Sequence, residues 1–325
     1  GEVKVSTDGV PRCDLRLATE EGGCDPRLVL RLINPEIEGY LDTMQFSPAS
    51  AVTCSGSFLL AKEPHLNLTG TLHTPRWQWA KVELADVAAE WGLRGSEIRW
   101  DIERASFCQG TVASTGLYDT VDRAGTLAVE LENASLTTIV TAFGTGQAVP
   151  ESDSKVAFSG RARFLRDWAG RPVQLTGGGQ LDITEGDLWR VPVLSQLGAL
   201  LDLPLLHRLS RGTATGLGQI SALRADLIFD GERVSVPHFF TDGTVISLTG
   251  TGEYSWRTDR VEFDVAGEAF RQMGGLVSLV TSPISWVFNA RLSGTSKDYR
   301  WRMNNALRRA ILGEEDSDKN HLGPP

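Results

Sequence analysis

Strand-like alternation of apolar and polar residues runs along most of the chain, and this pattern limits the folds that are open to it. Between residues 225 and 265 apolar side chains occupy every second position, and turn signals such as Gly231-Glu232 and Asp242-Gly243 separate the segments. Period-two alternation with short connections indicates an antiparallel meander. The same texture continues back to Leu28. We therefore predict a mainly β protein, a long curled antiparallel sheet (open β-groove) with a few short amphipathic helices.

Four segments predict those helices, because their apolar residues fall near helical spacing or because a proline opens the segment. They are Leu84–Leu93, Leu136–Phe143, Pro192–Leu209 and Arg271–Phe288. None is long and apolar enough to span a bilayer, which takes roughly 18 or more apolar residues. Glycine makes up 34 of the 325 residues. Because the usual share is about 7%, this excess predicts many turns.

Composition and motif spacing exclude several kinds of function. Asp and Glu number 41 against 32 Lys and Arg, a net charge of −9, whereas a nucleic-acid binder needs a basic surface. The five histidines include no pair at metal-ligand spacing, and no Gly-x-Ser-x-Gly motif is present. The triple glycine Gly177-Gly178-Gly179 runs into a strand and lacks the Lys-Ser/Thr of a phosphate loop, so it predicts a bend or bulge in the sheet. We predict no enzyme activity, no metal and no cofactor.

The four cysteines leave two interpretations open. Cys13 and Cys24 flank an acidic, glycine-containing segment, a spacing that suits a disulfide closing a hairpin in an oxidising compartment. Four unconnected thiols are the alternative, since an even count alone establishes no pairing.

The C-terminal half carries a series of short motifs in a fixed order: a strand ending in glycine, a proline-led helix start, a hairpin and a Gly-Thr…Trp ending. The motif residues are Gly186, Leu188, Trp189, Val191, Pro192, Leu194, Leu227, Phe229, Gly250, Gly252, Gly294, Thr295 and Trp301. This series resembles the C-terminal module of the AsmA-like proteins, with Tyr299 where that family usually has proline. Segment Gly70–Trp79 shares the Gly-Thr-x4-Arg-Trp pattern with Gly294–Met303 and keeps the proline, as Pro75, which predicts a structural repeat.

The resemblance implies an architecture and a location. AsmA-like proteins are typically anchored in the inner membrane of Gram-negative bacteria and extend a β-groove across the periplasm, where they are implicated in carrying phospholipids to the outer membrane. We accordingly expect N-terminal β-groove repeats at 1–170, an AsmA-like C-terminal module at 171–312 and a disordered tail at 313–325. The chain would be periplasmic, anchored to the inner membrane through an N-terminal segment absent from it. The oxidising periplasm would favour the Cys13–Cys24 disulfide.

The apolar face of a long sheet must be shielded from water. An open groove could achieve this by binding alkyl chains, because burying one CH₂ group is worth about 0.8 kcal/mol. We hypothesise a non-enzymatic lipid-handling protein whose β-groove carries phospholipid acyl chains between the inner and outer membranes. The groove candidates are Leu227, Phe229, Val234, Val236, Ile246, Leu248, Val261, Phe263 and Val265. The membrane-contact candidates, in and beside the uncharged run of the last predicted helix, are Leu276, Val277, Leu279, Val280, Trp286 and Phe288.

Two other functions stay open. A scaffold or assembly factor for outer-membrane proteins could act through an exposed sheet edge, with the outer-membrane protein machinery as its partner. A carbohydrate-active protein would need paired carboxylates in a cleft, together with aromatic platforms. The nine tryptophans keep this second alternative open.

Overall fold

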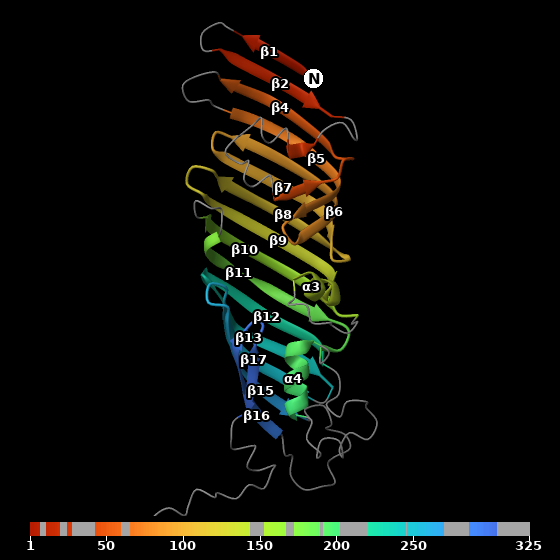
Figure 1. Ribbon diagram of the computed structural model, residues 1–325, viewed down its shortest axis with the longest axis vertical. Coiled ribbons are helices and arrows are strands. Elements are labelled where there is room, and N and C mark those ends of the chain that lie inside the picture. Colours follow the sequence, from red (N-terminus) through yellow and green to blue (C-terminus); the bar gives the residue numbers. More distant parts are fainter. Residues whose placement is uncertain are drawn as a thin grey trace, which may run out of the picture. The chain divides into compact units, whose positions relative to one another are not determined.

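The computed structural model describes residues 1–6, 11–19, 25–27, 43–59, 66–143, 153–166, 172–188, 191–201, 220–244, 246–269 and 286–303. The protein is mainly β, a curled antiparallel sheet of 17 strands that stays open, and this confirms the predicted fold class (Figure 1). The described part adds two short helices, α3 (Leu136–Phe143) and α4 (Pro192–Leu201). The first strands are β1 (Glu2–Ser6), β2 (Arg12–Ala18), β3 (Met44–Phe46), β4 (Ala51–Leu59), β5 (Leu66–Trp79), β6 (Val82–Arg94), β7 (Glu97–Phe107), β8 (Gly110–Asp119) and β9 (Ala124–Ser135). The remaining strands are β10 (Lys155–Arg166), β11 (Pro172–Thr184), β12 (Ile220–Gly231), β13 (Arg233–Gly243), β14 (Ile246–Ser255), β15 (Arg260–Ala269), β16 (Trp286–Thr295) and β17 (Tyr299–Met303).

The chain forms two compact units. Unit 1 comprises Gly1–Ile183 with Ile228–Glu232, and unit 2 comprises Thr184–Leu227 with Arg233–Pro325. Strand β11, which we expected in the C-terminal module, belongs largely to unit 1.

Unit 1 is a meander in which neighbours in sequence are neighbours in space. From β4 to β10 each strand pairs antiparallel with the strand that follows it. Strand β2 pairs with β1 and β4, and the short β3 pairs with the far end of the long β5. Because connections are short and pairing is local, the predicted period-two pattern translates directly into this order of strands.

One face of unit 1 is apolar and the other is polar. Two clusters of buried residues lie on the apolar face, one around Leu68 and Leu93 and the other around Val87 and Ile102. The intervening residues, such as Thr69, carry polar groups on the opposite face. Successive side chains of a strand point to opposite faces, so the sequence alternation sets the identity of each face.

The predicted helix at Leu84–Leu93 is wrong, since these residues form most of β6. The register with β7 shifts between Ala85 and Ala88, and Asp86 adopts a positive φ of 50°. This irregularity moves Leu84 and Val87 onto the same face although they stand three residues apart. A bulge in a strand therefore mimics the apolar spacing of a helix.

The predicted helix at Leu136–Phe143 is confirmed as α3. Ser135 caps it, because its Oγ accepts a hydrogen bond from the backbone N–H of Thr138, with a donor–acceptor distance of 3.3 Å. The backbone N–H of Leu136 donates to the carbonyl of Ser154 at 3.0 Å, which joins the helix start to the segment before β10.

Unit 2 contains the antiparallel strands β13 to β17 and the helix α4. The predicted helix start at Pro192 is confirmed, and residues 202–209 lie outside the described residues. Trp301 Nε1 on β17 donates to the carbonyl of Val193, at 2.9 Å, and ties the first turn of α4 to the sheet. Leu197 of α4 is fully buried, so the helix packs its apolar side rather than exposing it.

Two further sequence predictions are corrected in unit 2. Of the predicted helix Arg271–Phe288, residues 271–285 lie outside the described part, but Trp286 to Phe288 open strand β16. The predicted repeat also fails. Gly70–Trp79 lies within one continuous strand, whereas Gly294–Met303 spans the end of β16, a turn and β17. Four shared residues do not specify the turn, which the Thr295 N–H closes by donating to the Asp298 carbonyl.

Candidate functional site

Six aromatic residues of the apolar faces stand directly opposite a glycine on the neighbouring strand. The pairs are Trp91–Gly70, Trp100–Gly116, Phe164–Gly125, Phe239–Gly250, Phe263–Gly252 and Phe288–Gly267. A methyl group built on any of these glycines would lie within 2.6 Å of the opposite ring. Each ring therefore lies over its glycine, close against the sheet. The excess glycine thus serves strand interiors as well as the turns that we predicted from it.

The apolar face of unit 1 stays partly exposed across its central strands. On β8 to β10 its large side chains are neither fully buried nor fully exposed, in contrast to the buried Leu68 and Leu93. These partly exposed residues are Val112, Tyr118, Leu127, Val129, Leu131, Phe158 and Phe164. Together with the low-lying rings of Trp91 and Trp100, they form an accessible apolar surface, which we call the apolar floor.

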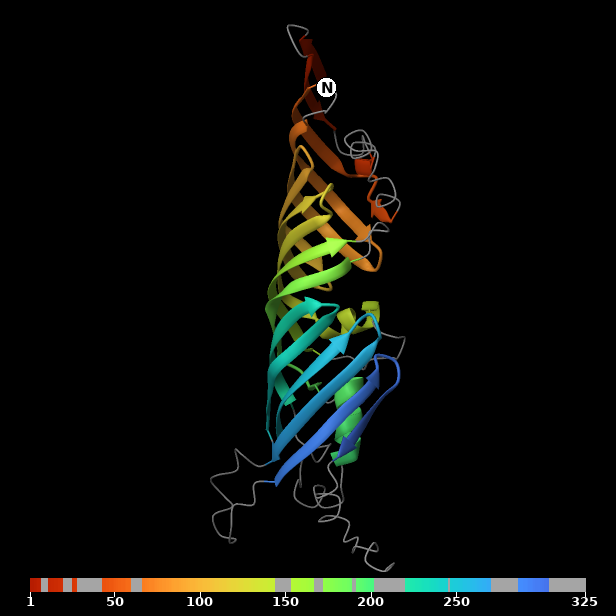
Figure 2. The ribbon, with the colours of Figure 1, turned by 90° about the vertical axis from the view of Figure 1, so that its left-hand side faces the viewer.

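A contact between Arg166 and Trp79 shows that the apolar floor lies inside the curl of the sheet. The guanidinium carbon of Arg166 lies 5.5 Å from the ring centre of Trp79. Trp79 ends β5 and Arg166 ends β10, and the paired strands β6 to β9 separate them. In a flat sheet these five interstrand steps would hold the two strands about 24 Å apart. The sheet of unit 1 therefore rolls around the apolar face. Figure 2 shows its strands running obliquely and curving.

Arg166 is unusual because the alternation of β10 places its charge on the apolar face, two residues after Phe164. On β8, β9 and β10 the other described residues of this face are uncharged. The guanidinium also lies 5.7 Å from the ring centre of Tyr118 and 5.5 Å from that of Phe164, and these two rings stack on each other. A cation over several aromatic faces is attracted by their quadrupoles.

A second polar group faces the same region. Trp77 precedes Trp79 by two residues on β5, and its ring stacks parallel to that of Phe46. Its Nε1 is buried without a hydrogen-bond acceptor in the part of the chain that the structure describes. A buried donor without an acceptor costs on the order of 1–3 kcal/mol. The end of the apolar floor near Trp79 therefore contains a guanidinium packed among aromatic rings and a buried indole N–H.

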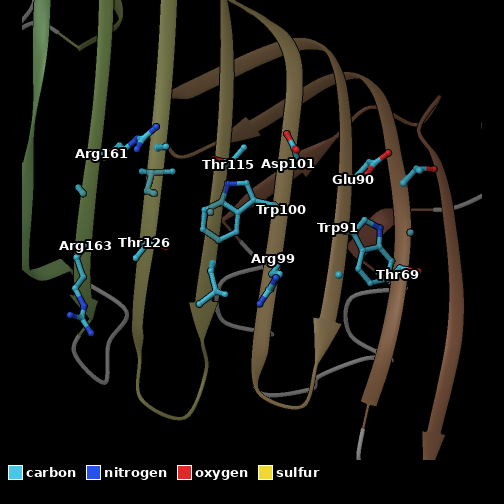
Figure 3. Close-up of a pocket in the computed structure, with 18 of the residues that line it drawn as sticks. Thr69, Glu90, Trp91, Arg99, Trp100, Asp101, Thr115, Thr126, Arg161 and Arg163 are labelled. Atoms are coloured by element: carbon cyan, nitrogen blue, oxygen red, sulfur yellow. The ribbon is translucent and has the colours of Figure 1, made fainter.

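The opposite, polar face of unit 1 contains a shallow hollow of about 1090 Å³. Figure 3 shows side chains from β5 to β10 that line it, among them Glu90, Asp101, Arg161 and Arg163. The hydroxyl groups of Thr53 on β4 and Thr71 on β5 form a hydrogen bond, with an oxygen–oxygen distance of 2.8 Å. A twisted sheet is saddle-shaped, so each face can be hollowed along a different diagonal.

The chemistry of this hollow does not assemble a catalytic centre. Glu90 and Asp101 stand directly opposite each other on β6 and β7, and the described lining includes neither histidine nor cysteine. Their sequence neighbours Trp91 and Trp100 face the other side of the sheet. Carboxylates and aromatic platforms thus point into different spaces, an arrangement that a glycan cleft would not use.

The predicted groove residues differ in burial: some are buried and the others are partly exposed. Seven of them lie on β13 to β15, and the registers bring them to one face of unit 2. Val236, Ile246, Leu248 and Val265 are at most 8% exposed and belong to a packed core. The partly exposed residues of the set are Leu227, Phe229, Val234, Val261 and Phe263.

The structure describes only some of the other predicted site residues. Leu276, Val277, Leu279 and Val280 lie outside the described residues. Trp286 begins β16, and Phe288 is only 5% exposed, with its ring over Gly267; its membrane contact stays a prediction. Cys13 carries a buried free thiol on β2, and Cys24 lies outside the described residues.

Sequence reasoning missed the apolar floor, because we searched for groove residues only in the C-terminal strands. Two signals were present in the chain. Trp100 alternates with polar residues on a predicted strand, and Arg166 follows Phe164 at the spacing of one strand face. The pairing of aromatic residues with glycines was not visible, since it depends on the register of neighbouring strands.

No family model matches the chain, and no curated protein and no solved structure matches it significantly. The described residues contain no group of three His, Cys, Asp or Glu side chains that could hold a metal ion. Within them, no helix has the length and apolar character needed to cross a membrane.

Proposed function

We propose that this protein is a non-enzymatic lipid-handling protein, in which the apolar floor of unit 1 shields the acyl chains of phospholipids. The proposal keeps the AsmA-like interpretation of the sequence, with a periplasmic location and passage of lipid between two membranes. It moves the main lipid-contacting surface from the C-terminal strands to β5–β10.

The observation that carries the proposal is the contact between Arg166 and Trp79, which places a partly exposed apolar face inside the curl of a single sheet layer. Contiguous apolar surface that stays partly exposed is typical of ligand- and partner-binding sites. Alkyl chains need no directed hydrogen bonds, so a smooth floor of Leu127, Val129 and rings lying over glycines would suit them. Each buried CH₂ contributes about 0.8 kcal/mol.

The test is a chain-length series of fluorescent phospholipids that differ only in their acyl chains. Affinity should rise about fourfold for each added CH₂ until the floor is filled. Val129→Asp places a charge on the apolar floor and should abolish binding. Ala128→Asp is the matched control, because Ala128 is the preceding residue, lies on the polar face and is also partly exposed.

Circular dichroism and urea unfolding would establish that both variants fold. Equal losses of binding in the two folded variants, or affinity that is independent of chain length, would contradict the proposal.

A scaffold acting through a sheet edge is the second candidate, and strand β1 favours it. Both faces of β1 are exposed, and Val3 and Val5 are each 59% exposed. Within the described residues β1 pairs with β2. Its other edge could pair with a strand from a partner protein. Replacing Lys4 by proline removes a backbone N–H. Loss of strand-peptide binding in this variant, with lipid binding intact, would favour the scaffold.

A further inference from the structure

We infer that the curl of unit 1 admits one alkyl chain at a time, and that Arg166 sets this limit by joining the two sides of the curl. Its guanidinium lies among the rings of Trp79, Tyr118 and Phe164, and we call these four residues the clasp. A phospholipid would place one acyl chain inside the curl and leave the other outside. The inference rests on the proposed function, because it assumes that the apolar floor accepts alkyl chains.

The number of strands inside the clasp limits the room. Trp79 belongs to β5 and Arg166 to β10, so the sheet returns upon itself within six strands. A closed barrel of eight strands has an interior that side chains fill or that holds one small ligand. A curl that returns after six strands is narrower than such a barrel. Its inner space therefore suits a single alkyl chain rather than two chains lying side by side.

Side chains of the protein already occupy part of this space. The rings of Trp77 and Trp100 pack against the buried cluster around Val87 and Ile102, on β5 to β7. The partly exposed apolar residues, such as Leu127, lie instead on β8 to β10. The accessible part of the apolar floor is thus mainly a strip on these three strands, and not the whole inner face.

The strip is low in relief and leads to the clasp. Phe164 lies over Gly125, close against the sheet, so the ring does not stand up from the surface. An extended alkyl chain can contact a flat surface along its whole length, and dispersion attraction grows with the number of such contacts. Because Phe164 also contacts Arg166, a chain on the strip ends beside the clasp.

Arg166 connects the two sides of the curl through aromatic contacts. The guanidinium carbon lies 5.5 Å from the ring centre of Trp79 on β5, and 5.7 Å from that of Tyr118 on β8. A cation is attracted to the face of each ring. Shortening this side chain would remove the contact and allow β5 and β10 to separate. We therefore expect the loss of Arg166 to widen the curl and to admit a second chain.

The experiment compares octanoyl lysophosphatidylcholine with dioctanoyl phosphatidylcholine, which share a head group and differ by one acyl chain. Binding is measured by isothermal titration calorimetry on the full chain, below the concentrations at which the lipids aggregate. If both chains entered the curl, each added CH₂ would contribute about fourfold, and the two-chain lipid would bind more than about a thousandfold more tightly. With one chain inside, the two wild-type affinities should agree within about tenfold.

Variants assign the limit to the clasp. Arg166→Ala should raise the affinity for the two-chain lipid, relative to the one-chain lipid, at least about tenfold above the wild-type ratio. Arg163→Ala is the matched control, because Arg163 is exposed on the polar face of the same strand, and it should keep the wild-type ratio. Trp79→Leu removes a ring from the clasp and replaces Arg166→Ala in the design if that variant does not fold.

A distance measurement separates widening of the curl from a change in affinity alone. Lys81 and Leu165 are exposed residues beside the clasp, and each would carry a spin label on an introduced cysteine in a chain without its native cysteines. Electron–electron resonance should give a longer distance between the labels after Arg166→Ala and an unchanged one after Arg163→Ala. An unchanged distance in folded Arg166→Ala would contradict the role of Arg166.

The outcomes distinguish the two proposals. If the wild-type protein binds neither lipid, the proposed function fails together with this inference. If it binds the two-chain lipid more than about tenfold more tightly, the single-chain limit is refuted while lipid handling stands. If folded Arg166→Ala keeps the wild-type ratio, or if Arg163→Ala changes it equally, the clasp does not set the limit.

Discussion

The pairing of aromatic rings with glycines makes a prediction that can be worked out at Gly116. Alanine is normally better than glycine in a strand interior by roughly 0.5–1 kcal/mol. At Gly116, however, the new methyl group would overlap the indole of Trp100. The ring must then leave its place, and overpacking of this kind costs about 1–3 kcal/mol. We expect Gly116→Ala to destabilise the protein, against its intrinsic preference.

Urea unfolding of a double-mutant cycle tests the cause. With Trp100 replaced by alanine, Gly116→Ala should become neutral or stabilising, which gives a coupling energy within the range of about 0.5–3 kcal/mol seen for residues in contact. Gly92→Ala is the control, because a methyl group there would meet its nearest neighbour, the Leu68 carbonyl oxygen, at an ordinary 3.7 Å. That variant should be neutral or slightly stabilised. The explanation is refuted if Gly116→Ala is harmless beside the intact Trp100.

Three further predictions concern single residues. Burial raises the pKa of the Cys54 thiol, so Cys54 should react with maleimide far more slowly than an exposed thiol at neutral pH, as mass mapping of the labelled chain would show. The pKa of Asp119 is lowered chiefly by a hydrogen bond from the Asp122 backbone N–H, and also by hydrogen bonds from Ser96 and the Val121 N–H. Because the folded pKa is the lower one, the stabilisation is present above the unfolded pKa and is lost as pH falls through the folded pKa. Asp119→Asn should therefore flatten the acid limb of the free energy of unfolding plotted against pH. Trp301→Phe removes the hydrogen bond to Val193 and should cost about 0.5–1.5 kcal/mol, with faster amide exchange in α4 as its local signature.

The sequence predicted the class of fold because a period of two survives in almost every strand. It misled where the strand itself is irregular. The shift near Asp86 gave β6 the spacing of a helix, and the uncharged run before Phe288 concealed the start of β16. Local pattern cannot distinguish a bulged strand from a helix, since both bring residues three apart to one face.

The candidate site was less predictable than the fold, for a different physical reason. Val236 and Leu248 were correctly placed on one face, but whether a face is open or covered depends on what packs against it. The role of Arg166 depends on Trp79, whose strand is brought near only by the curl. A contact of this kind is long-range in sequence and arises from the accumulated twist of several strands.

The meander of unit 1 also sets the steps by which such a sheet can change length. From β4 to β10 each strand runs opposite to the strand before it. Insertion of a single strand would reverse the direction of every strand that follows, whereas insertion of a hairpin would leave them all unchanged. Lengthening or shortening by whole hairpins is therefore the modular operation open to this architecture, and an engineered sheet with one hairpin removed between β6 and β9 should keep both of its faces.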